Sequence, residues 1–175
     1  MELSTRIYYY HPDQEIMAQL KTLFTEVHGD EARFISMAQA LNVELGQDLA
    51  QGLIDSVDSL EYDVDAEALE TIAGYHVCYF THGSDGDECI AQILFFLKSL
   101  IPDLHVQAWG CGDEDPWEFW YKFEGDDLLR EDDEPLNDPD EDEEIKASIY
   151  AWWHEGLPSE IRVGYLNESE EEEEE

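Results

Sequence analysis

The chain has 175 residues, of which 43% are hydrophobic and 12% aromatic, so we expect a buried core rather than global disorder. Its 45 acidic residues against eight lysines and arginines give a formal net charge of −37 at pH 7. Such a charge repels nucleic acid and anionic membranes, and the few basic residues are too scattered to form a basic stripe. The composition therefore argues against nucleic acid or a membrane as a direct partner.

The cysteines and the apolar segments predict a cytoplasmic protein. Cys78, Cys89 and Cys111 form no CxxC pair, and their odd number does not fit a disulfide framework. The first residues lack the basic and apolar regions of a signal peptide, and the apolar run at 90–97 is far too short to span a bilayer. We therefore expect reduced thiols in the cytoplasm.

The first 74 residues predict one strand followed by helices. Residues 6–11 (RIYYYH) are typical of a strand. A helix follows, because apolar residues recur at three- and four-residue steps until Gly29. Asp30 can cap a second helix, and a third is expected over 47–57. We expect residues 1–74 to form this strand and a mostly helical region packed on the main domain.

Residues 75–167 predict the main domain, in which strands and helices alternate. The expected strands lie at 75–82, 104–110, 117–124 and 160–166, and the expected helices at 87–100 and 141–155. This β-α-β-β-α-β order is that of a ferredoxin-like unit, so the predicted fold class is α+β. An acidic loop is expected at 125–139. The nearly all-Glu tail at 168–175 is predicted to be disordered.

Acidic residues are densest between positions 113 and 144, where 17 acids accompany two bases. Carboxylates spaced a few ångströms apart on rigid elements can imitate a phosphate backbone, which carries one charge per ~1.7 Å of duplex axis. Trp120, on the face of its strand opposite Phe119 and Tyr121, would lie on a polar surface or beneath the last helix. If exposed, it would supply a desolvated anchor. The expected partner contacts are Asp113, Glu114, Asp115, Trp120, Asp126, Asp127, Glu131, Asp132 and Asp133.

Two other interpretations of the acidity remain open. The run can be a solvated acidic loop that keeps the protein soluble. The whole chain can also be adapted to a high-salt cytoplasm, where proteins in general are acidic. Neither interpretation needs a partner.

Metal sites fit the sequence poorly. Asp138, Asp140 and Asp142 alternate as in an EF-hand loop, but the glycine and the final glutamate that such a loop needs are missing. The spacing of His76, Cys78, His82 and Cys89 matches no zinc pattern. We therefore expect neither a metal nor a cofactor.

An enzymatic site has a weaker basis than a binding site. Cys111 lies between two glycines, with His105 and His154 as possible bases, but the acids that follow would raise the pKa of its thiol. No nucleotide-binding, esterase or metalloprotease motif is present. We therefore expect a protein without catalytic residues.

A helix that leads into a strand ending in Trp109-Gly110, followed by acid-rich sequence, resembles the family of regulator of ribonuclease activity B. The resemblance covers roughly residues 75–144. It implies a ferredoxin-like shape and an inhibitor that binds a ribonuclease.

The sequence thus predicts a non-enzymatic acidic regulator or inhibitor. Its partner would be a basic protein, such as a nuclease or another nucleic-acid-binding protein, which it would bind by mimicking nucleic acid. One alternative is an immunity protein that neutralises a toxin, which relies on the same physics. Another is a small-molecule-binding domain or an enzyme that uses Cys111.

Overall fold

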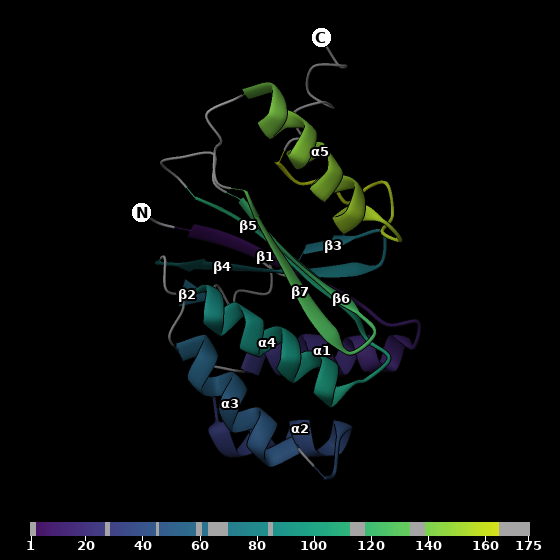
Figure 1. Ribbon diagram of the computed structural model, residues 1–175. Helices are drawn as coiled ribbons and strands as arrows, with labels where there is room; N and C mark the ends of the chain where they lie inside the picture. The colour runs from purple at the N-terminus through teal and green to yellow at the C-terminus, as the bar shows by residue number, and fades with distance from the viewer. Residues whose placement is uncertain are drawn as a thin grey trace.

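The computed structural model describes residues 3–26, 29–44, 46–58, 61–62, 70–83, 86–112, 118–133 and 139–164. It is an α+β structure in which helices cover both faces of an antiparallel sheet (Figure 1). The strands are β1 (Leu3–Tyr10), β2 (Glu61–Tyr62), β3 (Glu70–Ile72), β4 (Tyr75–His82), β5 (His105–Gly112), β6 (Glu118–Glu124) and β7 (Asp127–Asp133). The helices are α1 (Gln14–Glu26), α2 (Glu31–Leu41), α3 (Gly46–Asp58), α4 (Asp87–Leu100) and α5 (Pro139–His154).

The sheet has the strand order β2-β4-β1-β5-β6-β7, with β3 also paired to β4. β1 pairs antiparallel with both β4 and β5, so α4 connects two parallel strands that have β1 between them. Likewise, the three helices α1 to α3 connect β1 to β2 across β4. The N-terminal strand is therefore a central strand of the sheet.

The predicted ferredoxin-like unit over 75–167 is not confirmed, because the strand order differs. Residues 160–164 form no strand, and 165–166 lie outside the described residues. The outer edge of β4 is already paired with β2 and β3, which leaves no place there for a final strand. Ile161 and Val163 are instead buried in the core beneath α5.

The predicted acidic loop at 125–139 is wrong over β7. Gly125 and Asp126 form a two-residue turn between β6 and β7, and Gly125 has φ +62° at the first central position, where such turns favour glycine. Leu128 then packs against the main core, opposite Phe123 in register. Two adjacent leucines, one on each face of the strand, and a tight turn outweigh the acids that make this segment resemble a loop.

Most other predicted elements are confirmed to within a few residues. The Asp30 side chain caps α2 by accepting hydrogen bonds from the amides of Ala32 and Arg33, at 3.0 and 3.3 Å. The predicted tail at 168–175 lies outside the described residues. None of the described helices is long and apolar enough to cross a membrane.

The sheet separates two cores. Ile7 and Tyr9 of β1 face the larger core, which α1 and α4 cover, with α2 and α3 beyond them (Figure 1). Tyr8 faces the second core, where α5 packs through Tyr150 and Trp153. Among the described residues, α5 and the segment after it, with Ile161 and Val163, pack on this second face of the sheet (Figure 1).

Candidate functional site

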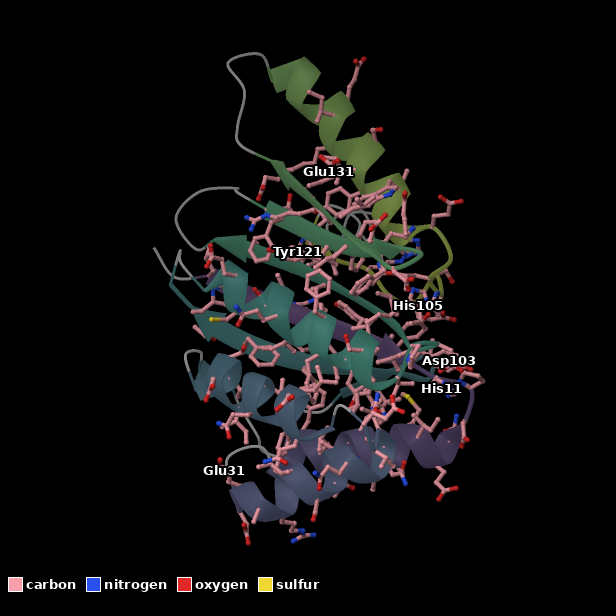
Figure 2. The ribbon with its side chains drawn as sticks, turned by 60° about the horizontal axis from the view of Figure 1, so that its bottom comes forward. His11, Glu31, Asp103, His105, Tyr121 and Glu131 are labelled. Carbon is pink, nitrogen blue, oxygen red and sulfur yellow. The ribbon has the colours of Figure 1, made fainter. Side chains whose placement is uncertain are left out.

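The edge of the sheet at β7 carries much of the predicted partner surface. β7 pairs only with β6 among the described strands, so its outer main-chain groups do not join the sheet ladder. Asp126, Asp127, Glu131 and Asp132 are exposed there. Figure 2 shows Glu131 beside α5, far from Glu31 on the helical side of the molecule. Asp133 ends the strand, opposite Glu118 in register.

An apolar groove lies between β7 and α5. Its volume is about 410 Å³, and its lining includes Leu129, Ile145, Ile149 and Trp152. Leu129 is 38% exposed and Ile145 41%, which makes them two of the most exposed large apolar side chains described. Glu131 lines the groove as well, so the groove combines an apolar wall with an acidic rim.

The predicted partner contacts do not include these apolar residues. The spacing of Ile145 and Ile149 in the predicted helix is typical of a buried face, so Ile145 resembles a core residue. Leu129 lies in the segment that the sequence predicts as an acidic loop. The pair Leu128–Leu129 within the acidic run is a signal that could have indicated a strand with one apolar side chain on each face.

Arg130 fixes β7 to the sheet and neutralises part of its acidity. Its guanidinium donates to both carboxylate oxygens of Asp132, with an Nη2–Oδ1 distance of 2.7 Å, and to the Tyr121 hydroxyl at 2.9 Å. It also lies 5.3 Å from the ring centroids of Phe119 and Tyr121. Because Asp132 is already paired, Asp126, Asp127 and Glu131 are the more available contacts.

Trp120 lies beneath the last helix, which is one of the two positions that the sequence left open, so it is not an exposed anchor. Its side chain is 0% exposed and packs edge-to-face on Tyr150 of α5, with ring centroids 5.2 Å apart. The strand alternation was predicted correctly, but the face that carries Trp120 is covered by α5. Trp152 is the half-buried tryptophan at the groove, where its Nε1 donates to Glu124 at 3.0 Å. The predicted contacts Asp113, Glu114 and Asp115 lie outside the described residues.

A catalytic pair of Cys111 and His105 is not assembled. The two side chains lie on the same face of β5 but six residues apart, which is about 20 Å along a strand. Burial, and then the charge of Glu118, raise the pKa of the Cys111 thiol and disfavour the nucleophilic thiolate. His154, the other candidate base, has its Nε2 2.7 Å from the carbonyl oxygen of Ile161.

The residues considered for metal binding are not gathered into a site in the described part of the chain. No three His, Cys, Asp or Glu side chains there lie close enough to hold one ion. His76 contacts the Tyr9 hydroxyl at 3.1 Å, and His82 contacts the Thr5 hydroxyl at 2.6 Å. These histidines are thus hydrogen-bonded between β4 and β1.

No protein-family model, no curated protein and no solved structure matches the chain. The resemblance to the regulators of ribonuclease activity therefore stays a prediction, and the function is argued from the surface itself.

Proposed function

We propose that this protein is a non-enzymatic acidic regulator that binds a basic, nucleic-acid-handling protein through the edge of β7 and the adjacent groove. The observation that carries the proposal is the conjunction of three features on one surface: an open strand edge, exposed carboxylates and an apolar groove. An extended segment can add to an open edge by main-chain hydrogen bonds, while its side chains enter neighbouring grooves.

The acids on β7 select the charge of the segment. Edge strands are commonly protected by charged side chains, which prevent two copies from pairing. A second β7 would place carboxylates against carboxylates, and directly opposed like charges are destabilising. A segment with lysines or arginines at those positions gains attraction, and apolar side chains between them can contact Leu129 and Ile145. The edge therefore excludes a second copy and favours a basic partner.

The charge density of β7 sets how far it can imitate nucleic acid. Residues 126–133 hold five acids and one arginine. At ~3.4 Å per residue, this is about one net charge per 7 Å, against one per ~1.7 Å along duplex DNA. β7 alone is thus a sparse mimic, and Glu143 and Glu144, exposed on α5, extend the acidic surface. The apolar groove supplies the desolvated contact area that the charges lack.

A defined basic peptide tests the surface directly. The probe is a synthetic peptide of alternating lysine and valine, with an alternating glutamate and valine peptide as its control. We expect saturable binding of the basic peptide that weakens between about 50 and 500 mM salt, shifts of the β7 amide resonances, and no binding of the acidic peptide. Uniform small shifts over the whole acidic surface would show attraction to charge without a site.

Charge reversal provides the matched comparison. The variant Asp126→Lys, Asp127→Lys, Glu131→Lys should lose about tenfold or more in affinity. The control reverses three exposed acids on the helical side, Glu15, Glu44 and Asp48, and should lose much less. Equal losses in both variants would overturn the assignment to β7. The ribonuclease resemblance makes a basic ribonuclease the first natural partner to assay, by inhibition of RNA cleavage with the same variants.

A further inference from the structure

A second recess, away from β7's outer edge, carries the opposite charge. It has a volume of about 280 Å³ and lies where α4 ends, β5 begins and β6 turns at Gly125. Lys98, His105 and Lys122 line it, so two of the eight lysines and arginines of a strongly acidic chain meet in one small recess.

The two lysines keep donors available. Lys98 Nζ donates to the carbonyl of Leu104 at 3.1 Å and lies 5.7 Å from the ring centroid of Phe123. Lys122 Nζ donates to the carbonyls of Trp152 and Glu155 at 2.7 and 3.2 Å. An ammonium has three donors, so two remain at Lys98 and one at Lys122. Within the described residues, neither lysine forms an ion pair with a carboxylate.

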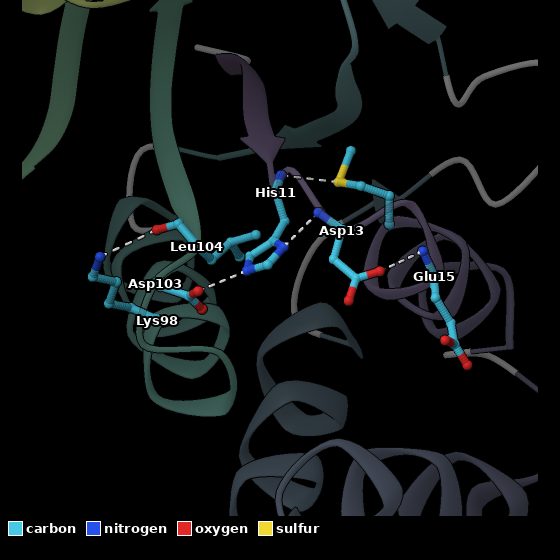
Figure 3. Close-up of polar contacts among 7 residues, drawn as sticks. His11, Asp13, Glu15, Lys98, Asp103 and Leu104 are labelled. Carbon is cyan, nitrogen blue, oxygen red and sulfur yellow. Dashed lines mark hydrogen bonds and ion pairs between the residues drawn. The ribbon is translucent and has the colours of Figure 1, made fainter.

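Asp103, the carboxylate among the lining residues, contacts His11. Its Oδ2 lies 2.9 Å from His11 Nε2, and this contact is the main cause that lowers the pKa of Asp103, with a smaller lowering by the charge of Lys98. Figure 3 shows Asp103 reaching toward His11 while Lys98 reaches the carbonyl of Leu104 on the other side. His11 Nδ1 accepts from the amide of Asp13 at 3.0 Å, which leaves the proton on Nε2, toward Asp103.

His105 reports the charge of the recess. Its Nδ1 lies 2.7 Å from the Tyr75 hydroxyl and its Nε2 lies 2.9 Å from Gln107 Oε1. The Gln107 amide nitrogen donates to the carbonyl of Trp153, so its Oε1 accepts and His105 Nε2 carries the proton. Burial is the main cause that lowers the pKa of His105; the hydrogen bond with Gln107 raises it, and the charges of Lys122 and Lys98 lower it further.

From this arrangement we infer that the recess binds a compact oxyanion with two negative charges, namely inorganic phosphate or a phosphate monoester. No arginine lines the recess, so it lacks the planar fork that suits a carboxylate, whereas lysines act as point charges for phosphate. At physiological ionic strength, charges more than about 8 Å away are largely screened, so the charges that act in the recess are the two ammonium groups and the carboxylate of Asp103, which contacts His11.

Titration with inorganic phosphate at constant ionic strength, with chloride as the replaced anion, tests the inference. We expect saturable binding by calorimetry, and an increase in the pKa of His105 measured from its ring resonances. The groups that face this ring are Tyr75, Lys98 and Lys122, and a bound anion offsets the two charges that lower its pKa. The absence of saturation, or saturation without a change at His105, would overturn the proposal. Methyl phosphate in place of phosphate shows whether an ester is admitted.

Lysine variants test the site and provide its control. Lys98→Met should weaken phosphate binding about tenfold or more and abolish its effect on His105. Lys21→Met, an exposed lysine of α1, should leave both unchanged. Lys122→Met also removes two contacts to carbonyls at the end of α5, so its thermal unfolding is measured alongside. Equal binding by the wild type and Lys98→Met would refute the site, and none of these outcomes depends on β7.

Discussion

Replacing Glu118 with alanine tests how α5 is held on the sheet. Glu118 lies on β6 and is 6% exposed. Its Oε1 accepts hydrogen bonds from Trp109 Nε1, at 3.1 Å, and from the Tyr150 hydroxyl, while its Oε2 lies 3.0 Å from Lys146 Nζ. Since Tyr150 and Lys146 belong to α5, one carboxylate joins β5, β6 and the helix.

The magnitude follows from what the alanine leaves behind. Removal of one partner from a buried ion pair costs about 3–5 kcal/mol, and each buried donor left without an acceptor costs about 1–3 kcal/mol. The Lys146 side chain is 20% exposed and can regain water, so the ion-pair loss lies at the lower end. With about 3 kcal/mol for the ion pair and at least about 1 kcal/mol for each of the two donors left without an acceptor, we expect about 5 kcal/mol or more for Glu118→Ala. Glu118→Gln keeps an acceptor and loses only the charge, so we expect about 1–3 kcal/mol.

Urea unfolding followed by tryptophan fluorescence and circular dichroism measures both variants. A loss below about 1 kcal/mol for Glu118→Ala, or equal losses for the two variants, would refute this account of the cluster. Ile145 and Trp152 of α5 form one wall of the groove, so Glu118→Ala should also weaken the binding of the basic peptide. Glu118→Gln should retain most of that binding.

Four further outcomes follow from charge and packing. The melting temperature should rise from low to high NaCl, because salt screens self-repulsion; a flat response would contradict this. Burial is the main cause that lowers the pKa values of His76 and His105 in the folded protein. As the pH falls, these histidines therefore bind protons in the unfolded chain before they do so in the folded chain. Their contribution to stability is therefore present above about pH 6.5 and lost as the pH falls through the folded pKa values, and His105→Gln should flatten this dependence in pH-dependent urea unfolding. Cys111 should react with iodoacetamide more slowly in the folded than in the unfolded protein at mildly alkaline pH, because its thiol pKa is raised. Gly110→Ala should cost about 1–3 kcal/mol in the same unfolding assay, since the new methyl group would overlap the ring of Phe119, its partner in register.

Local pattern predicted most of the elements but not their neighbours. The strand β4 and the helix α4 begin and end at the predicted residues, because apolar spacing and flanking glycine or proline are properties of the local chain. The position of β1 between β4 and β5 is a long-range property. The residues of the segment Leu3–Tyr10 do not indicate which strands it pairs with. Apolar residues on both of its faces indicate only that both faces are covered.

The candidate site was predicted only in part, for a similar reason. The exposed acids of β7 were identified from composition, because charged side chains stay in water wherever the chain goes. Whether Trp120 is exposed depends on where α5 packs, which its strand cannot indicate. The groove is formed by Leu129 of a strand and Ile145 of a helix. In the sequence, neither residue differs from an ordinary apolar residue, because the groove exists only where the two elements pack together.

The placement of the basic residues explains why the surface is more acidic than the net charge suggests. Six of the eight are half-buried and two, Lys21 and Arg33, are exposed, both on the helical side. Arg6 lies 5.5 and 5.4 Å from the ring centroids of Tyr79 and Trp109. Main-chain carbonyls accept hydrogen bonds from Lys98, Lys122 and Arg162, and the buried carboxylate of Glu118 pairs with Lys146. The positive charges thus serve to join elements, and few are left on the outside to compete for the carboxylates. A basic partner that also reached Asp132 would displace Arg130, an exchange of one ion pair for another. The affinity would then come mainly from the groove and the strand edge, with charge selecting the partner and speeding its approach.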